Sequence, residues 1–430
     1  MPGVESPLAQ VRQAVREQPL LVAYVLLATG VWAREGHYSL PALVVVLSGF
    51  VIAVEGLRAS ASRPPGWKVL LACLGMLLVM NLYKPPSIRL ESALYVPAYR
   101  SLCAVLLLIV VGGLTGRWLR GLVVLGLVGA VLFRLWMPIA SPGPDIDVFH
   151  VSQAAAECLE AGRNPYRERL SQEPPFHYVY PPSSLYAQTL AHAAFGDVRY
   201  ASVLADLVVA ICLVRLALRR WSRREAALLA LVWLYHPCGL LVVGLAWTEP
   251  LLAATLALAL VLLERRTAAA VVYGGFLSLK QYLLFFGLHW FLLERSWKRI
   301  LLGLATACLS AAPFAAWDWG SLWSQGVLST YLNVPPRPDS LSLSSVLYPW
   351  LGPPPKSLTV LVGAITAVGM FLTCRGGGLP GYCRAVTITT FAMFLFGAQA
   401  YCNYYDFVGA LLLLTLACQS YSDVSSLRAR

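Results

Sequence analysis

Long apolar runs separated by short polar segments make up most of the chain. A helix needs about 20 apolar residues to cross the hydrocarbon core of a bilayer. Twelve runs approach or reach that length, and they lie near residues 19–34, 38–57, 67–83, 99–116, 119–139, 198–219, 225–245, 249–264, 299–316, 357–374, 384–400 and 403–419. This pattern predicts an all-α polytopic membrane protein with about 12 transmembrane helices.

Basic residues in the connecting segments predict the orientation of these helices, because cytoplasmic loops carry an excess of Lys and Arg. Basic clusters follow the second, fourth, sixth and eighth apolar runs. They are Arg58, Arg63 and Lys68, then Arg117 and Arg120, then Arg219, Arg220, Arg223 and Arg224, and finally Arg265 and Arg266. All of them fall on the inner side if both termini are cytoplasmic. No convincing small-residue cleavage site follows the first run, so we expect a retained first helix.

Residues 268–293 do not fit a simple crossing. They lie between Arg266 and a cluster of Arg295, Lys298 and Arg299, so both ends are predicted to be cytoplasmic. About 26 residues are too few to cross the bilayer twice at about 1.5 Å per residue. The segment therefore predicts a re-entrant helical hairpin with Lys280 near its tip. Non-helical backbone at membrane depth must line a cavity or be buried in protein, so we expect Lys280 in a polar cavity.

Two large loops are predicted on the outer side, at residues 140–197 and 317–356. Within the first, residues 150–161 have apolar positions at helical spacing and predict a short amphipathic helix at the interface. A second short helix is expected over residues 183–195, after the stiff Tyr-Pro-Pro sequence at 180–182. Most polar material of the protein is therefore expected outside.

The composition agrees with a membrane protein. Hydrophobic residues make up 58% of the chain and charged residues 13%, against about 45–50% and about 25% in soluble domains. These values exclude a disordered protein, a disulfide-stapled secreted domain and an ordinary cytosolic enzyme. The net charge of +12 resides mainly in the predicted cytoplasmic loops, so it does not indicate a nucleic-acid partner. Most of the 10 cysteines lie in apolar runs, where cysteine behaves as a small hydrophobic residue. Cys158 and Cys402 lie in predicted outer segments, and a disulfide bond between these two is the alternative.

Three segments carry ionisable side chains near the predicted outer face: residues 145–150 (DIDVFH), residues 247–250 (WTEP) and Lys280 with Gln281. The carboxylates and histidine of the first can hold a cation or supply a general base, although acidic loop starts are also commonly solvated. Glu249 and Lys280 adjoin apolar runs, where charges are costly and often functional. Their structural alternatives are an ion pair for Glu249 and snorkelling to the interface for Lys280.

Other polar residues give weaker signals. Arg337 in the second outer loop is suited to phosphate binding, and a solvated loop arginine is an equal alternative. Arg134 and Asp206 lie inside predicted spans and can form a structural pair. The sequence has no P-loop, GxGxxG, HExxH or GxSxG motif. Nothing therefore points to a nucleotide cofactor, a zinc protease or a serine hydrolase.

The order of these features resembles the GT-C glycosyltransferases, in particular the polyprenol-phosphate-mannose-dependent α-mannosyltransferases of actinobacteria. Those are multi-span proteins with an acidic motif in a large outer loop, followed by an amphipathic helix. The similarity covers roughly residues 119–345. It rests on segments 145–150, 162–166 (GRNPY), 180–182 (YPP), 196–200 (GDVRY), 247–250, 279–281 (LKQ) and the Ser-Leu-Ser stretch around Leu341.

The resemblance implies roles for individual residues. The outer-loop Asp of the family acts as general base on the acceptor hydroxyl, and Asp147 and Asp145 are both candidates. Lys280 matches a family lysine that meets the donor phosphate, and Glu249 is implied in binding acceptor hydroxyls. Further candidates for substrate or donor binding are His150, Tyr166, Tyr180, Gln281 and Arg337. No cofactor or metal is required, although a divalent cation held by Asp145 and Asp147 is permitted.

The resemblance therefore implies a glycosyltransferase of the bacterial cytoplasmic membrane with an outward-facing site. It would transfer mannose or a similar hexose or pentose, with inversion, from a polyprenyl-phosphate donor to a glycan, glycolipid or protein acceptor. A transporter or flippase of a lipid-linked or anionic substrate is the alternative, and it would favour mid-bilayer charges and internal repeats. Relatives usually have one span before the acidic loop, whereas five precede it here. We expect added N-terminal helices in residues 1–118, a catalytic core in 119–345 and C-terminal helices in 346–430.

Overall fold

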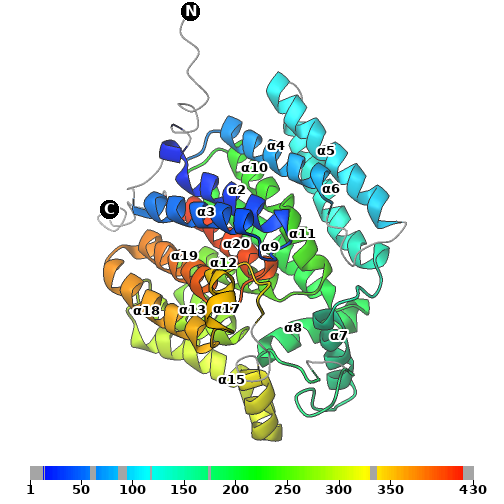
Figure 1. The fold of residues 1–430 in the computed structure, drawn as a ribbon, viewed down its shortest axis with the longest axis vertical. Coiled ribbons are helices and arrows are strands. Elements are labelled where there is room, and N and C mark those ends of the chain that lie inside the picture. Colours follow the sequence, from blue (N-terminus) through cyan, green and yellow to red (C-terminus); the bar gives the residue numbers. More distant parts are fainter. Residues whose placement is uncertain are drawn as a thin grey trace, which may run out of the picture.

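The computed structural model describes residues 13, 15–58, 64–85, 94–116, 119–172, 176–329 and 337–419. Helices dominate these ranges, and the β-pairing found within them is one isolated bridge between His37 and Ser340. The predicted all-α class is therefore confirmed. The arrangement of the helices is shown in Figure 1.

The helices follow the predicted apolar runs closely. The N-terminal part contains α2 (Pro19–Ala33), α3 (Leu40–Arg58), α4 (Trp67–Tyr83), α5 (Tyr95–Thr115) and α6 (Leu119–Ala140). Next come α7 (Asp147–Glu160), α8 (Pro182–Phe195), α9 (Arg199–Ala217), α10 (Arg223–Leu234), α11 (Pro237–Gly244) and α12 (Glu249–Val261), which ends in the 3-10 turn η1 (Leu262–Glu264). The last part contains α13 (Arg266–Leu277), η2 (Gln281–Leu283), α14 (Leu284–Trp290), α15 (Trp297–Ser321), the π-helix η3 (Leu322–Leu328), α17 (Leu343–Leu351), α18 (Ser357–Thr373), α19 (Gly378–Phe396) and α20 (Cys402–Gln419).

Among the described residues, six helices are long and apolar enough to cross a membrane, which fits an integral membrane protein. They are α3, α5, α6, α9, α15 with η3, and α19. Helices α10 and α11 form a seventh candidate that is bent by 55°, because Pro237 cannot donate a backbone hydrogen bond within a continuous helix. Three shorter apolar helices, α2, α4 and α18, also match predicted runs. The count of about 12 crossings stays a prediction.

The predicted hairpin region consists of two short helices with a break between them. Helix α13 has 12 residues and α14 has seven, lengths of about 18 Å and about 10 Å against a bilayer core of about 30 Å. Between them, residues 278–280 are non-helical, and the 3-10 turn η2 then leads into α14. Lys280 is extended, with φ −151° and ψ 146°. The break lies at the predicted tip, whereas the re-entrant path through a membrane stays a prediction.

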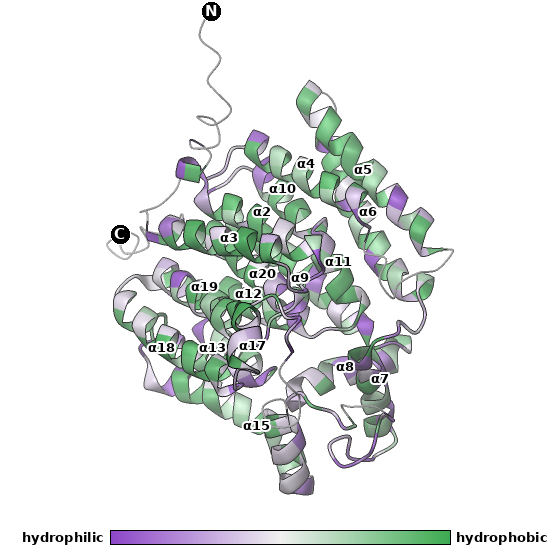
Figure 2. Cartoon of the chain, in the orientation of Figure 1, coloured by the Kyte–Doolittle hydropathy of each residue, from purple (hydrophilic) through white to green (hydrophobic). Residues whose placement is uncertain are grey.

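The two predicted loop helices are present as α7 and α8, which pack side by side at one end of the molecule (Figure 1). More hydrophilic residues surround them than cover α5 or α18 (Figure 2). The described parts of the second predicted loop, residues 317–329 and 337–356, contain more helix than expected. Its first part continues α15 through η3 to Leu328, with a local break at Asp318 (φ −161°, ψ 92°).

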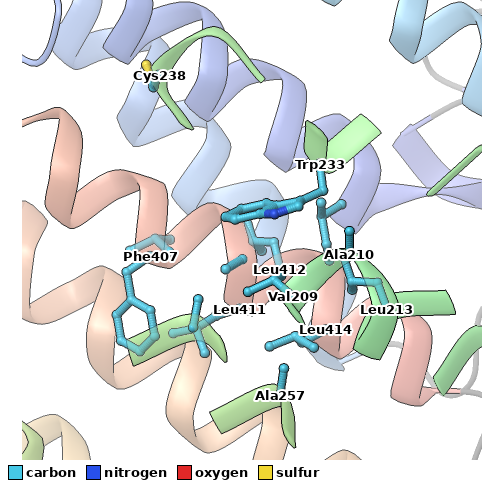
Figure 3. Packing of buried hydrophobic residues seen from close by; sticks show 14 of the residues in the cluster. Val209, Ala210, Leu213, Trp233, Cys238, Ala257, Phe407, Leu411, Leu412 and Leu414 are labelled. Atoms are coloured by element: carbon cyan, nitrogen blue, oxygen red, sulfur yellow. The ribbon is translucent and has the colours of Figure 1, made fainter. Parts of the chain in front are cut away.

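The interior is built around α9, which packs along apolar faces against α10, α12 and α20. Figure 3 shows the ring of Trp233 among side chains of these helices, including Val209 and Leu412. The N-terminal helices belong to the same core, since α2 packs on α20 and Tyr24 donates a hydrogen bond to the carbonyl of Val232 at 3.2 Å. One hydrophobic core contains buried side chains from all three predicted segments. The segment boundaries at residues 118 and 345 therefore stay predictions.

Two minor expectations have clear outcomes. Arg134 on α6 and Asp206 on α9 form the ion pair that the sequence allowed. The ten cysteines are free, and Cys158 and Cys402 are both buried. The alternative of a bridge between these two residues is therefore wrong.

Candidate active site

A cavity of about 350 Å³ opens among segments that are far apart in the sequence. This volume is within the range of small-molecule sites, about 300–1,000 Å³. Its polar lining comes from the α2–α3 loop, the start of α7, the segment before α8, the break after α13, the segments before α17 and α18, and the start of α20. The polar and aromatic side chains are Glu35, His37, Asp147, Tyr180, Trp247, Lys280, Gln281, Tyr282, Arg337, Lys356, Thr359, Phe394, Gln399, Tyr401, Asn403 and Tyr404.

A buried ion pair between Lys280 and Glu249 forms one wall of the site. Lys280 is 5% exposed and Glu249 is completely buried, and the Nζ of Lys280 contacts Oε1 of Glu249. Asn403 donates a second hydrogen bond to the same oxygen, at 3.0 Å. Glu249 is the first residue of α12, where the helix dipole favours a carboxylate. The charges of Lys280 and Glu249 must pair, because either charge buried alone would strongly destabilise the fold.

Three tyrosine rings surround the ammonium group of Lys280. Its Nζ lies 4.8 Å from the ring centre of Tyr404, 5.5 Å from that of Tyr180 and 5.6 Å from that of Tyr282. Such contacts stabilise a cation, more strongly where water is excluded. Burial raises the pKa of the Tyr180 phenol well above its usual value, and the carboxylates of Glu249 and Asp147 raise it further. Tyr180 thus lies within electrostatic range of both acidic residues.

Two side chains fix the segment that carries Tyr180. The hydroxyl of Tyr166 donates to the carbonyl of Tyr180 at 2.8 Å, and the Nε2 of Gln281 donates to the carbonyls of Val179 at 2.8 Å and Gly326 at 2.9 Å. Tyr166 is buried behind the segment and does not line the cavity. Gln281 both lines the cavity and connects this segment to η3.

The structure distinguishes the two carboxylates of the acidic motif. Asp147 is the first residue of α7, lines the cavity and accepts a hydrogen bond from the backbone N–H of Val148 at 2.8 Å. Asp145 is exposed and is not among the lining residues. His150, about one turn into α7, is also exposed and outside the lining. Of the three ionisable residues in this motif, Asp147 is the one at the cavity.

A second polar cluster lies at the cavity around Arg337. Its Nε and Nη2 donate to the two carboxylate oxygens of Asp339, at 3.1 Å and 2.7 Å. Tyr401 donates to Asp339 at 2.8 Å, and His37 Nε2 lies 3.7 Å from the same carboxylate. Burial raises the pKa of Asp339, but the hydrogen bonds from Arg337 and Tyr401 outweigh it, so the pKa lies below its usual value. Asp339 therefore remains ionised and holds Arg337 at the cavity.

Several lining residues had no role in the sequence-based prediction. Lys356 is half-buried, and this burial lowers its pKa to about 8. Asn403 and Tyr404 belong to a polar start of the last apolar run, residues 401–406 (YCNYYD). That cluster was a visible signal, because polar residues at a span end often face a cavity. Glu35 and His37 lie in a short polar segment between the first two apolar runs, and nothing in the sequence marked them as site residues.

Most predicted site residues thus meet at one place: Asp147, Tyr180, Lys280, Gln281 and Arg337 line the cavity, with Glu249 directly behind Lys280. Asp145, His150 and Tyr166 lie outside its lining. The catalytic and binding roles of all these residues stay predictions. Across the described ranges, no three His, Cys, Asp or Glu side chains are grouped to hold a metal ion. The predictions on cofactors and a divalent cation are untested.

Residues 178–398, slightly more than half of the chain, match the family model described as glycosyltransferase family 87. No curated protein and no solved structure matches the chain. The matched segment includes Tyr180, Glu249, Lys280 and Arg337, and it excludes Asp147 and the N-terminal helices. The match favours the enzyme over the transporter alternative and agrees with a cavity that combines a carboxylate, a buried cation and aromatic rings. The chain therefore belongs to glycosyltransferase family 87, a GT-C-like family of membrane glycosyltransferases.

Proposed function

We propose that this glycosyltransferase transfers a hexose, with mannose as the first candidate, from a polyprenyl-phosphate donor to a glycan, glycolipid or protein acceptor. The reaction takes place at the outer face of a bacterial cytoplasmic membrane and inverts the anomeric centre. One observation carries the proposal: a single cavity among apolar helices is lined both by a buried cation, Lys280, and by an exposed carboxylate, Asp147.

The cations support a phosphate-bearing donor. Lys280, Arg337 and Lys356 all line the cavity. Cations form strong hydrogen bonds to phosphate oxygens, and negative charge grows on the phosphate as the glycosidic bond breaks. A fixed cation at that position lowers the barrier. Nucleotide sugars are absent outside the bacterial membrane, whereas a polyprenyl chain can lie among the apolar helices.

The acceptor step follows from the carboxylate. In the proposed reaction, an acceptor hydroxyl oxygen attacks the anomeric carbon of the donor and forms the new glycosidic bond. The bond from that carbon to the phosphate oxygen breaks, and its electron pair leaves with the polyprenyl phosphate. The hydroxyl proton passes to the carboxylate of Asp147. General bases of this kind contribute about 10²- to 10⁴-fold to a rate.

Glu249 acts as a positioning residue in this scheme. Its carboxylate holds Lys280 among the three tyrosine rings, and Asn403 fixes the carboxylate in turn. Tyr166 holds the Tyr180 segment from outside the cavity, and Gln281 holds it from within the cavity lining. No cofactor is required, and a divalent cation, if used, would bind at Asp145 and Asp147.

The test is sugar transfer in vesicles that contain the purified full-length protein. Labelled polyprenyl-phosphate mannose is supplied with a lipid and glycan extract as acceptor, and polyprenyl-phosphate glucose and a nucleotide-linked mannose serve as alternative donors. We expect a labelled product from a polyprenyl-phosphate donor and none from the nucleotide sugar. Asp147→Asn should lower kcat by about 10²- to 10⁴-fold, whereas Asp145→Asn should change it less than about threefold. Transfer from the nucleotide sugar alone would overturn the donor assignment, and full activity of Asp147→Asn would overturn the base assignment.

A further inference from the structure

The loop between α2 and α3 supplies an acidic side chain to the cavity, although it lies outside the segment that matches the family. Glu35 and His37 both line the cavity. Glu35 is only 4% exposed, and the Nζ of Lys84, after the end of α4, lies 2.8 Å from its Oε1. A nearly buried carboxylate is costly unless it is paired. Lys84 therefore pairs with Glu35 at a position that lines the cavity.

The Lys84 segment is itself anchored to α2. The indole Nε1 of Trp32 donates to the carbonyl of Lys84 at 3.0 Å and to that of Met80 at 3.2 Å. Trp32 is almost completely buried. Glu35, its cationic partner and the backbone at Lys84 are therefore held together against α2, as in a site arranged before its ligand binds.

The backbone at Glu35 is strained. Glu35 has a φ of 53°, a value that residues other than glycine rarely adopt. The next residue, Gly36, has a φ of 81°. A Cβ atom at Gly36 would lie 2.1 Å from the backbone nitrogen of Cys402, so the loop fits closely against the start of α20. That start also carries Tyr401, Asn403 and Tyr404 of the cavity. Strain of this kind persists where the surrounding structure enforces it, which is common at ligand sites.

An ion pair with a purely structural role explains these features less well. The Glu55–Arg58 pair on α3 is an example of such a contact, since both side chains are exposed and their backbone is helical. Glu35 differs in its burial, in its strained backbone and in its position at a cavity. Its carboxylate accepts hydrogen bonds only, which matches the hydroxyl groups of a sugar.

We propose that Glu35 is a specificity-determining residue that accepts hydrogen bonds from hydroxyl groups of the hexose, with Lys84 holding the carboxylate in place. This inference rests on the proposed function and adds a residue of the N-terminal helices to the sugar site. These helices then belong to the active site rather than forming an appendage. The hydroxyls come from the donor hexose or from a hexose of the acceptor, and kinetics separate these two sources.

The experiment compares the full-length protein, Glu35→Gln and the control Glu55→Gln in vesicles. KM and kcat are measured for donor and acceptor, together with a series of monodeoxy-hexose donors and acceptors. We expect Glu35→Gln to raise one KM by about 10- to 100-fold with kcat within about threefold, because a hydrogen bond to a charged group is lost. The substrate whose KM rises identifies the source of the hydroxyl. The variant should also lose discrimination against one deoxy sugar, since sites that bind a hydroxyl reject its absence.

A second variant covers the case in which Glu35→Gln leaves Lys84 unpaired and unfolds the loop. Glu35→Gln combined with Lys84→Met removes both charges, and thermal unfolding in detergent verifies that it folds. The same KM change and loss of discrimination are expected. A folded variant, single or double, with wild-type KM values and wild-type discrimination would overturn the inference.

Failure of the proposed function can be distinguished from failure of the inference about Glu35. If the wild-type protein transfers no sugar from any polyprenyl-phosphate donor, the proposed function fails, and Glu35 is tested by binding alone. Saturation-transfer NMR with methyl mannoside and methyl glucoside then compares wild type with Glu35→Gln and Glu55→Gln. Binding to wild type and Glu55→Gln but not to Glu35→Gln supports the inference. Equal binding to all three proteins, or binding to none, overturns it.

Discussion

Among the described residues, two ion pairs of Lys or Arg with a carboxylate have both partners almost completely buried, and they differ in what surrounds them. Arg134 and Asp206, on α6 and α9, are 0% and 1% exposed. Arg134 also donates to the carbonyls of Leu234 at 2.7 Å and Ala130 at 3.3 Å, and neither Arg134 nor Asp206 lines the candidate active-site cavity. Lys280 and Glu249 are buried to a similar extent, but Lys280 lines the cavity and faces three tyrosine rings.

The difference shows that burial of a charge does not by itself indicate a functional site. In the first pair, the hydrogen bonds of the guanidinium are directed at protein groups, and the pair joins two helices. In the second pair, the ammonium group is held by one carboxylate and lies where a ligand can enter. A candidate site differs from a structural ion pair in two respects: it opens to a cavity, and its cation can bind another anion.

The sharpest test replaces each pair with neutral side chains of similar size. Such replacements of buried pairs are often tolerated by the fold, so activity is read without loss of structure. We expect Lys280→Met with Glu249→Gln to lower kcat by about 10²- to 10³-fold, since a cation at the leaving phosphate is lost. Arg134→Met with Asp206→Asn should retain activity within about threefold. Sugar transfer in vesicles measures both, and equal losses in the two double variants would remove the distinction.

Single substitutions test the pairs as elements of stability. Arg134→Met leaves Asp206 charged without a partner in a sealed interior, which costs about 3–5 kcal/mol of unfolding free energy. Lys280→Met should cost less, because Asn403 still donates a hydrogen bond to Glu249 and the N-terminus of α12 still favours its carboxylate. Denaturant unfolding in detergent, followed by tryptophan fluorescence, gives the two values. A larger loss for Lys280→Met than for Arg134→Met would contradict the assignment of Arg134 as the structural brace.

The sequence was sufficient to predict most of the helices, although not α17 or the continuation of α15 through η3, and only part of the site. Apolar runs marked α2 to α6 and α9 closely, because the length and polarity of a span are local properties of the chain. Lys280, Glu249 and Asp147 were visible because charges beside apolar runs are costly. Glu35 and Lys356 were not, since each lies in an ordinary polar loop, and only the tertiary packing of distant helices brings them to the cavity. Local spacing also did not distinguish Asp147, which lines the cavity, from Asp145, which does not.

Lys356 gives a pH test of the open site that has no equivalent at Arg134. Burial lowers its pKa to about 8, so it is protonated below that pH and loses its charge as the pH rises through it. If it binds the donor phosphate, the donor KM should increase by up to about tenfold above pH 8. Lys356→Arg, which stays charged, should remove this increase, and Lys356→Met should show a high KM at every pH. An unchanged pH profile in Lys356→Arg would exclude Lys356 as the titrating group.

Metal removal should have the smallest effect. Lys280, Arg337 and Lys356 already supply positive charge at the cavity, so neutralising the leaving phosphate does not demand a divalent cation. We expect EDTA to change the rate of sugar transfer by less than about twofold, with the EDTA-treated Arg134→Met/Asp206→Asn variant as a matched control. A loss of more than about tenfold that Mg²⁺ or Mn²⁺ restores would instead assign part of the phosphate charge to a metal ion. The carboxylates of Asp145 and Asp147 would then be its first candidate ligands, and Asp145→Asn, neutral for activity in the present scheme, would become strongly deleterious.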